Sequence, residues 1–428
     1  MATNSTVIVP MLLPARLLSE IRARFHHVGT CPITKAPRIF FENGGGSLKL
    51  RAAIAASAEL AAIPDQEQRD NDASRYITAV INRGREDLRL FFGASTGQVI
   101  SGETGTELIY RFIRAVALSA PAGPFLSSSL EHPASFDSAK LWADRTGRTR
   151  IAIKLDIHSG TVTPADYAQA ITPDTRLATV IHTSQLTGLH VDLPGIVAAI
   201  RRVAPDCYVI VDGIQNAPHG RVEVDRYGAD AYVFSAYKAY SRLAIGFAWI
   251  GPRLERVPHE HMQGKSDKYW ELGSRDPGIY ASHSAVVDYF DWVGSHFTTD
   301  AGRRARILAA ADAMAAHEKA LVGLLIDGNG PRPGLVQNNK VTLVGPASLD
   351  DRQGIVSFGL AGRSAPDLVR EFAQRGIRVH ARIDDAYSGH ILADLGLKDC
   401  LRVSLCHYNT PEEVDAFLAA LQDISASI

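Results

Sequence analysis

Short runs of β-branched and aromatic residues alternate along the chain with longer windows in which apolar residues recur at helical spacing. The strand-like runs cover residues 177–183, 208–212, 231–235 and 245–250, and helical or loop stretches separate them. Strands that alternate with helices are typical of α/β folds, in which helical crossovers join parallel strands. The pattern therefore predicts a large α/β domain built on a mostly parallel sheet.

The pattern changes after Gly278. Apolar residues then recur at helical spacing over residues 282–293 and 303–325, and the second window is long enough to link two domains. Four strand-like runs and two helical windows follow, at 340–344, 354–360, 365–375, 377–380, 401–405 and 411–424. The sequence thus predicts three parts: an N-terminal segment over residues 1–45, a large domain over 46–310 and a smaller α+β domain over 311–428.

Composition and charge exclude several classes of protein. The 428 residues include 45 Lys and Arg against 46 Asp and Glu, so the balance gives no reason to expect a nucleic-acid partner. No apolar stretch reaches the roughly 20 residues that span a bilayer, and no basic residue precedes the short apolar run near the N-terminus. We therefore expect neither membrane insertion nor secretion.

Four cysteines are too few for a disulfide scaffold, and they lack the paired short spacings of zinc sites. The sequence predicts a reduced cytoplasmic protein without a structural metal.

An acid and a lysine follow two neighbouring predicted strands. Asp212 ends one apolar strand, a second strand ends at Ser235, and Lys238 comes just behind it. In open α/β sheets, ligands bind outside the carboxyl ends of the strands, so both charges are expected to face one site. Taken singly, each residue is more often a turn cap or a solvated surface group. A lysine behind an apolar strand is desolvated, however, and such an amine loses its proton readily and forms Schiff bases.

Residues 211–220 (VDGIQNAPHG) and 234–238 (FSAYK) resemble the class V aminotransferase and cysteine desulfurase family of pyridoxal phosphate enzymes. The resemblance implies a fold-type I homodimer that binds pyridoxal 5'-phosphate near the subunit interface. It makes Lys238 the Schiff-base lysine, pairs Asp212 with the pyridine nitrogen and places Gln215 on the ring oxygen. A carboxylate keeps that nitrogen protonated, which makes the ring an electron sink.

Residues 102–107 (GETGTE) match the family's phosphate-binding turn and precede a predicted helix. Backbone N–H groups and the dipole at a helix start favour a dianion. The resemblance therefore assigns phosphate binding to Gly105 and Thr106, with the hydroxyl of Ser235 added. In residues 271–275 (ELGSR), it assigns Ser274 to the phosphate of the neighbouring subunit.

The resemblance also implies residues for the cofactor ring and the substrate. His132, in residues 130–135 (LEHPAS), matches a histidine that stacks on the pyridine ring. Arg402, in residues 400–409 (CLRVSLCHYN), matches an arginine that grips the α-carboxylate of the amino acid, which suits a planar guanidinium. Gln185 falls near a family asparagine, and Asn43 lies in residues 40–47 (FFENGGGS), a segment expected over the active site.

One departure from the family bears on the reaction. In cysteine desulfurases, the loop that residues 382–388 (RIDDAYS) match carries a nucleophilic cysteine, and this loop has none. Cys400 and Cys406 flank Arg402 on a predicted strand, where small buried hydrophobes are more common than nucleophiles. A persulfide mechanism is therefore disfavoured.

The sequence leaves several functions open. The first choice is a C–S or C–Se lyase that needs no persulfide cysteine. An epimerase of the isopenicillin N epimerase type and an aminotransferase are the alternatives within the family. A phosphate-binding protein without catalytic activity would explain the glycine-rich turns, but it would leave Lys238, Asp212 and Arg402 without a joint role.

Overall fold

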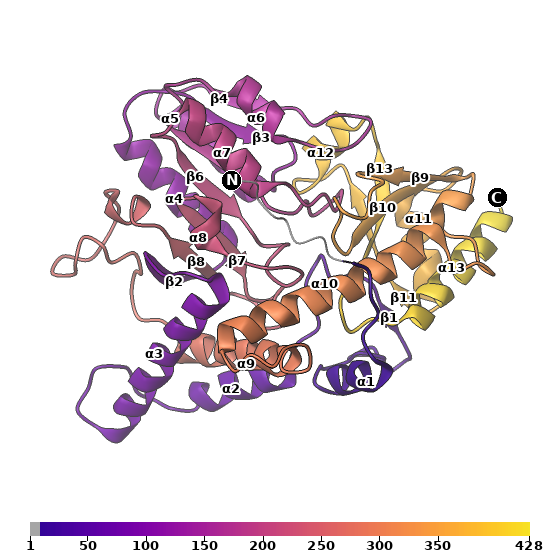
Figure 1. Cartoon of the computed structure of the whole chain (residues 1–428), viewed down its shortest axis with the longest axis horizontal. Coiled ribbons are helices and arrows are strands. Elements are labelled where there is room, and N and C mark those ends of the chain that lie inside the picture. Colours follow the sequence, from indigo (N-terminus) through magenta and orange to yellow (C-terminus); the bar gives the residue numbers. More distant parts are fainter. Residues whose placement is uncertain (1–8) are drawn as a thin grey trace.

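A seven-stranded sheet lies at the centre of the larger part of the molecule (Figure 1). The computed structural model describes residues 9–428, so the first eight residues of the predicted N-terminal segment lie outside the described residues. All neighbouring strands run parallel except β8, which is antiparallel to both of its neighbours. This confirms the predicted α/β fold with a mostly parallel sheet. In spatial order the strands are β2 (Gln98–Gly102), β8 (Gly246–Ile250), β7 (Ala231–Ser235), β6 (Tyr208–Asp212), β5 (Leu177–Ile181), β3 (Phe125–Ser128) and β4 (Arg150–Ile153).

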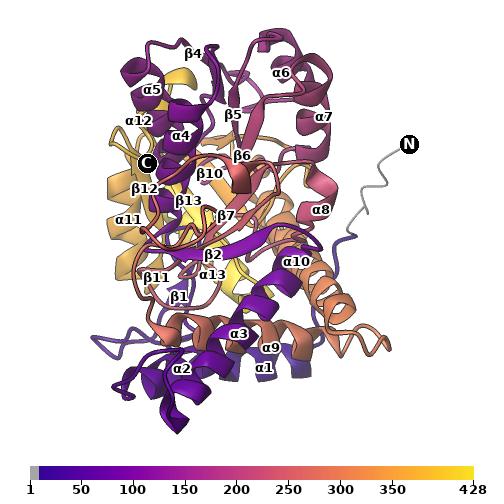
Figure 2. The ribbon, with the colours of Figure 1, turned by 90° about the vertical axis from the view of Figure 1, so that its left-hand side faces the viewer.

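Helices cover both faces of this sheet (Figure 2). On β6, Val209 and Val211 belong to one apolar core, and Ile210 belongs to another on the opposite face. Successive strand residues point to opposite faces, so a strand covered on both sides reads as a continuous apolar run. One face carries α4 (Gly105–Ser119) and α5 (Pro133–Arg145), and the other carries α6 (Pro164–Ala170), α7 (Leu193–Val203) and α8 (Val224–Tyr227).

A layer of helices lies at one end of the molecule, formed by α2 (Arg51–Ala61), α3 (Asp72–Phe92) and α9 (Pro277–Gly294), with α1 (Ala15–Ala23) beside them. Gly84 permits a close approach of α3 to α9, because a Cβ atom there would lie 2.5 Å from the Cβ of Tyr280. The 3-10 turn η1 (Leu254–Arg256) lies between β8 and this layer along the chain.

The long helix α10 (Arg303–Asp327) runs from the large part of the molecule to the C-terminal part (Figure 1). Ile307 and Met314 in its first half pack into the core of the large sheet. Leu321 and Leu325 in its second half pack into a separate C-terminal core. The predicted domain division at residue 310 falls within this helix and stays a prediction.

The C-terminal part contains a four-stranded antiparallel sheet in the order β12 (His380–Ile383), β13 (Asp399–Ser404), β10 (Ile355–Leu360) and β9 (Val341–Val344). Its helices are α11 (Ala365–Gln374), α12 (Gly389–Asp394) and α13 (Pro411–Ala426), with the 3-10 turn η2 (Leu335–Gln337).

The N-terminal segment crosses to this part of the molecule. Its strand β1 (Ile39–Phe40) pairs in parallel with β11 (Ile377–Arg378). The single strand predicted over residues 377–380 is therefore wrong in its extent. Its first residues pair with β1, and the chain from His380 onward pairs with β13 instead.

None of the helices within residues 9–428 has the length and apolar character that crossing a membrane requires.

Candidate active site

The carboxyl ends of the parallel strands bring several predicted site residues to one edge of the large sheet. Asp212 is the last residue of β6, and Ser235 is the last residue of β7. Gly105 begins α4 shortly after β2, and His132 follows β3 as the residue that caps α5. Residues at or just after the ends of four strands thus meet at the position where open α/β sheets bind ligands.

Lys238 lies in the turn after β7 and is only 8% exposed. Its Nζ donates to the carbonyl oxygen of Gly44 at 3.0 Å. Burial lowers the pKa of this amine to about 7, the Arg402 charge adds to the effect, and Asp212 opposes it. A large fraction of the Lys238 amine is therefore uncharged and nucleophilic near neutral pH.

Asp212 supplies the negative charge opposite this amine. Its Oδ1 accepts from the backbone N–H of Ile214 at 3.0 Å, and the residue is 3% exposed. Burial raises its pKa to about 6, while that N–H and Lys238 favour the charged form. Asp212 is therefore a carboxylate at neutral pH.

Glu131 is a second buried carboxyl group near Asp212, and sequence reasoning gave it no role. Burial, followed by the Asp212 charge, raises the pKa of Glu131 to about 8. Its Oε1 accepts from the N–H of Ile181 at 2.7 Å, and its Oε2 is buried without a hydrogen-bond partner. Glu131 is therefore protonated at neutral pH, which leaves Asp212 as the charged member of the two. Its place directly before His132 was the available signal.

The start of α4 forms a tight turn beside Ser235. The N–H of Gly105 donates to Ser235 Oγ at 3.3 Å, and a Cβ atom on Gly105 would lie 2.7 Å from that oxygen. Thr104 caps the helix by accepting from the N–H of Glu107, and Thr106 is exposed. This turn presents N–H groups and a hydroxyl together, as an anion site requires.

Ser274 lies exposed on the segment between η1 and α9. The ion pair of its neighbour Arg275 with Glu103, at 2.5 Å, brings this segment to the turn before α4 of the same chain. Its predicted contact with the phosphate of a neighbouring subunit stays a prediction.

His132 presents an uncharged ring at the site. Its Nδ1 accepts from the N–H of Ala134 at 3.1 Å and so caps the start of α5. Burial, then the charges of Lys238 and Arg382, lower its pKa to about 3. The ring of Tyr387 lies 5.9 Å from the His132 ring at an angle of 35°. A neutral imidazole held in this way is suited to stacking on an aromatic ligand.

Several buried polar atoms of the predicted site have no hydrogen-bond partner within residues 9–428. They are Gln215 Oε1, both side-chain polar atoms of Gln185 and Arg402 Nε. Gln215 Nε2 donates to the Gly44 carbonyl at 2.9 Å, and Arg402 Nη1 donates to the Gln185 carbonyl at 3.0 Å. Buried polar groups are normally hydrogen-bonded. Unpartnered hydrogen-bond donors and acceptors around Lys238 therefore indicate a polar ligand. A phosphorylated pyridine ring together with an amino-acid carboxylate fits this set of donors and acceptors.

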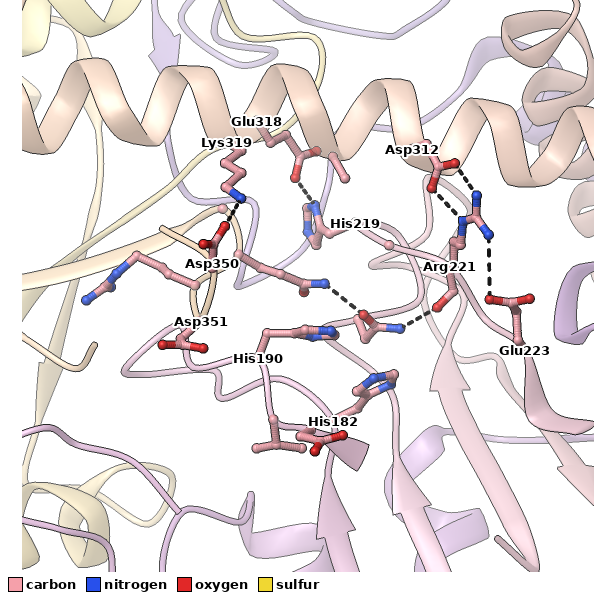
Figure 3. A pocket seen from close by; sticks show the side chains of 18 of the residues that line it. His182, His190, His219, Arg221, Glu223, Asp312, Glu318, Lys319, Asp350 and Asp351 are labelled. Atoms are coloured by element: carbon pink, nitrogen blue, oxygen red, sulfur yellow. Dashed lines mark hydrogen bonds and ion pairs between the residues drawn. The ribbon is translucent and has the colours of Figure 1, made fainter. Parts of the chain in front are cut away.

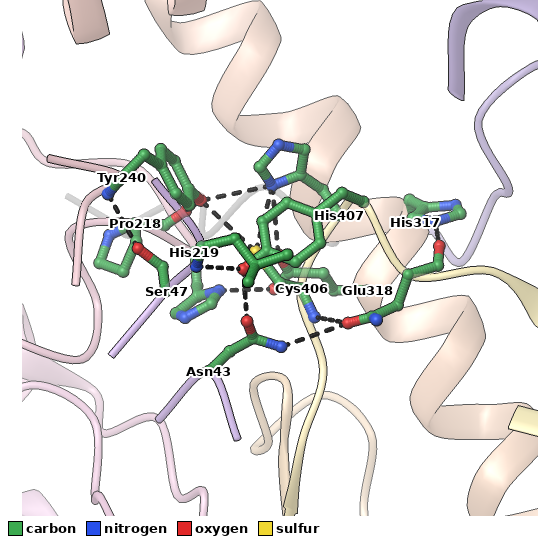
Figure 4. A network of polar contacts seen from close by, with 12 residues as sticks. Asn43, Ser47, Pro218, His219, Tyr240, His317, Glu318, Cys406 and His407 are labelled. Atoms are coloured by element: carbon green, nitrogen blue, oxygen red, sulfur yellow. Dashed lines mark hydrogen bonds and ion pairs between the residues drawn. The ribbon is translucent and has the colours of Figure 1, made fainter. Parts of the chain in front are cut away.

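The side chain of Asn43 is hydrogen-bonded to the C-terminal part of the chain (Figure 4). Its Nδ2 donates to the Ser404 carbonyl at 2.8 Å and to Asn409 Oδ1 at 3.2 Å, and its Oδ1 accepts from the hydroxyl of Tyr408. The amide joins the N-terminal segment to the end of β13, and the predicted contact of Asn43 with the substrate stays a prediction. The neighbouring carbonyl of Gly44 accepts from Lys238 and Gln215, and the three consecutive glycines were the signal for such a close approach.

A buried polar cluster lies near the contact between the N-terminal segment and the end of β13 (Figure 4). It contains side chains of the kinds that bind metal ions. Ligand atoms of His219, Glu318 and Cys406 lie within 4.8 Å of one another. His219 Nδ1 and Glu318 Oε2 are 2.9 Å apart, and Cys406 Sγ lies 3.8 Å from the hydroxyl of Tyr240. Cys406 thus lies beyond the end of β13, in a hydrogen-bonded core and not beside Arg402.

A cavity of about 650 Å³ lies against α10 and contains none of the predicted site residues in its wall (Figure 3). His182 and His190 stack within it at 4.8 Å, and Arg221 pairs with Asp312 of α10. Its charged groups largely pair with one another, unlike the unpartnered atoms around Lys238.

The sequence matches a known family over most of its length. The model of the family described as Aminotransferase class-V matches residues 39–417. The aminotransferase-like protein FGM3 of Gibberella zeae is 26% identical over 427 residues, covering 95% of this chain and 98% of that protein. A probable cysteine desulfurase of Halobacterium salinarum is 29% identical over 376 residues, covering 82% of this chain and 83% of that protein.

Solved structures share the fold. An apo structure of a cysteine desulfurase from Thermococcus onnurineus superposes with a TM-score of 0.81 at 19% identity, covering 98% of this chain and 100% of that one. The cysteine desulfurase CsdA from Escherichia coli gives a TM-score of 0.78 at 20% identity, covering 95% of this chain and 98% of that one.

Proposed function

Because the chain belongs to the class V aminotransferase family, whose members are pyridoxal phosphate-dependent enzymes, we propose that Lys238 holds pyridoxal 5'-phosphate and that the substrate is an amino acid. The observation that carries this proposal is the buried, uncharged Lys238 amine beside the Asp212 carboxylate, surrounded by unpartnered polar atoms. A phosphate-binding protein without catalysis would not need this arrangement.

The cofactor would be held from several sides. Lys238 would attach it through Nζ, and Asp212 would pair with the pyridine nitrogen. The turn at Gly105 and the hydroxyl of Ser235 would hold the phosphate, with His132 against the ring. Gln215 keeps a second Nε2–H that can reach the ring oxygen. When bound, the cofactor supplies an electron sink that stabilises negative charge on the α-carbon of the substrate.

Arg402 would bind the α-carboxylate of the substrate. Its guanidinium is 2% exposed and leaves Nε free, so two parallel N–H donors are available for a carboxylate. This contact fixes the α-carbon relative to Lys238. The Lys238 amine would then remove the α-proton, because an amine with a pKa near neutrality accepts a proton efficiently at that pH.

The cysteines favour elimination over persulfide transfer. Cys400 is fully buried and burial raises its pKa to about 12, and burial likewise raises the pKa of Cys406. Neither thiol forms a thiolate readily, and residues 382–388 contain no cysteine. Cys31 has a pKa lowered to about 7 by hydrogen bonds from Thr34, but it lies in the N-terminal turn. We therefore propose a C–S or C–Se lyase that acts without a persulfide cysteine.

The test is a product analysis of purified enzyme loaded with cofactor. A panel of S-substituted cysteines and ordinary amino acids would be assayed for sulfide or thiol, pyruvate, other oxo acids and loss of chirality. The proposal expects pyruvate with a thiol or sulfide, and none from Lys238→Ala. Oxo acid with transfer of the amino group would indicate an aminotransferase, loss of chirality alone would indicate an epimerase, and a trapped persulfide would restore the desulfurase reaction.

A further inference from the structure

Arg382 is a second buried arginine on the sheet face that carries Arg402. In the antiparallel pair of β12 and β13, Arg382 lies opposite Cys400, and Arg402 lies two residues further along β13. Residues opposite one another, and residues two apart on one strand, share a face of the sheet. Arg382 is 8% exposed and Arg402 is 2% exposed. Two guanidinium groups are therefore buried side by side at the proposed substrate site.

Neither guanidinium forms an ion pair with a carboxylate within residues 9–428. Arg382 Nη2 donates to the carbonyl of Tyr387 at 3.3 Å, and the Nε atoms of both arginines are buried without a partner. Glu42 is an acid that acts on both, but its oxygens are held by Arg378 at 2.5 Å and by His380 at 3.0 Å. Burying a charge without a partner is costly, so this face favours anionic ligands.

The position of Arg382 relative to the site follows from its neighbours. The carbonyl that it contacts belongs to Tyr387, whose ring lies against that of His132. The charge of Arg382 also lowers the pKa of both His132 and Lys238. Asp385, in the same loop, accepts from the N–H groups of Tyr387 and Ser388 at 2.8 and 2.9 Å, which fixes the turn around Arg382. Arg382 therefore faces the space between the proposed ring position and Arg402.

Two anionic groups are already assigned under the proposed function. The phosphate lies at the start of α4, and the α-carboxylate lies on Arg402. Asp385 and Glu42 act on Arg382 from beyond ion-pair distance, so within residues 9–428 its guanidinium has no carboxylate bound to it. We propose, as an inference that rests on the proposed function, that Arg382 binds an oxyanion on the side chain of the substrate, so the substrate class is amino acids with an acidic side chain. The planar fork of Arg382 matches a carboxylate in particular.

The test compares probes of similar size that differ in charge, using enzyme loaded with cofactor. The pairs are L-glutamate with L-glutamine, and S-carboxymethyl-L-cysteine with S-propyl-L-cysteine. Dissociation constants come from the change in cofactor absorbance and from thermal shift, and kcat/KM is added where product forms. The inference expects the acidic member of each pair to be preferred by about tenfold to a hundredfold, as a hydrogen bond to a charged group predicts.

Variants then locate the preference. Arg382→Gln should reduce the ratio of acidic to neutral probe to near unity while binding of the neutral probe persists, and Arg382→Lys should retain part of it. Arg375→Gln is the matched control, because Arg375 lies exposed at the end of α11 and donates to the carbonyl of Glu371. It should leave the ratio unchanged.

Several outcomes would overturn the inference. One is a ratio near unity in the unmodified enzyme, and another is an unchanged ratio in Arg382→Gln. A third is loss of the cofactor from Arg382→Gln with an unchanged ratio, which would assign Arg382 to the cofactor phosphate. A change in the oligomeric state of Arg382→Gln with an unchanged ratio would instead assign Arg382 to a subunit contact. If no amino acid perturbs the cofactor spectrum at all, the proposed function fails together with the inference. Reaction with neutral amino acids alone would leave the proposed function intact and sink only the inference.

Discussion

At the residue scale, the reactivity of Lys238 depends on its lowered pKa. Burial contributes more to that lowering than any single neighbouring charge does. An exposed lysine is charged at neutral pH, whereas the pKa of this amine is lowered to about 7. The nearby carboxylate of Asp212 opposes that shift only in part. The same burial that makes the amine reactive has a consequence for the stability of the protein without its cofactor.

Lys238→Met should stabilise the cofactor-free protein in a pH-dependent way. The folded pKa of about 7 lies below the ordinary value of 10.5, so the unfolded chain binds the proton more tightly. The unfavourable contribution of Lys238 is therefore fully present below the folded pKa and disappears as the pH rises through the unfolded value. The gain in unfolding free energy should be on the order of a few kcal/mol near neutral pH and should vanish by about pH 10.5.

Urea unfolding at several pH values measures this difference. Lys398→Met is the matched control, because Lys398 is exposed at the surface before β13. A gain for Lys238→Met that is the same at all pH values would contradict the assigned direction of the pKa shift, since it would reflect packing alone.

At the scale of secondary-structure elements, the start of α4 and the strand β13 carry the proposed contacts to the cofactor and the substrate. Gly105→Ala should disrupt the first. The added Cβ would meet Ser235 Oγ at 2.7 Å and the Ile214 Cδ1 atom at 2.8 Å, so the turn or the hydroxyl must shift. We expect affinity for pyridoxal 5'-phosphate to fall about tenfold or more, since each lost charge-assisted hydrogen bond is worth about 1.5–3 kcal/mol.

Equilibrium binding of the cofactor, followed by absorbance, checks this prediction. Gly359→Ala on β10 is the control, since no heavy atom lies within 4 Å of a Cβ at that position. Equal affinities for the two variants would mean that the start of α4 does not hold the phosphate.

The cysteines near β13 should be dispensable for catalysis. Cys400 and Cys406 are fully buried, so the double variant Cys400→Ala, Cys406→Ala removes apolar contacts and no nucleophile. It should keep its cofactor and most of its turnover, with a stability loss of about 1 kcal/mol per site. Turnover and persulfide trapping, with Cys31 mapped in parallel, are the measurements. A folded, cofactor-loaded double variant without turnover would restore a thiol mechanism.

Much of this element structure follows from local patterns in the sequence. The strands 208–212 and 231–235 were predicted with the bounds that the structure has, because strands covered on both faces are continuously apolar. Thr410 and Glu413 form a capping box at the start of α13, which the Thr-x-x-Glu spacing in the sequence favours. The local pattern also indicated Asp212 and Lys238, since Asp212 ends one strand and Lys238 comes shortly after another.

The features that the sequence did not yield depend on contacts between distant segments. The pairing of β1 with β11 divides a predicted strand, and the amide of Asn43 is used by Ser404 and Tyr408, which are far along the chain. The unpaired state of Arg382 is likewise visible only when all its neighbours are known. No local periodicity encodes such contacts.

At the scale of the whole molecule, two large apolar side chains are exposed on segments that adjoin the candidate site. Leu243 is 66% exposed in the segment after Lys238, and Tyr387 is 57% exposed beside His132. An exposed large apolar group beside a ligand site is a candidate for a subunit contact. They support the predicted homodimer with active sites near the subunit interface.

Leu243→Glu should therefore weaken the dimer and, with it, the binding of the cofactor. Sedimentation velocity at several protein concentrations measures the first effect, and absorbance of bound cofactor measures the second. Leu118→Glu is the control, because Leu118 is 63% exposed near the end of α4, at the opposite end of that helix from Gly105. A chain that sediments as a monomer before any substitution would contradict the dimer prediction.

Chemical identification of the lysine that carries the cofactor tests the central claim most directly. The purified enzyme, loaded with pyridoxal 5'-phosphate, is reduced with borohydride, digested and mapped by mass spectrometry. The buried, uncharged amine beside Asp212 predicts that the reduced cofactor is found on Lys238, and that Lys238→Ala carries none. A label on another lysine, or none on the unmodified enzyme, would contradict it.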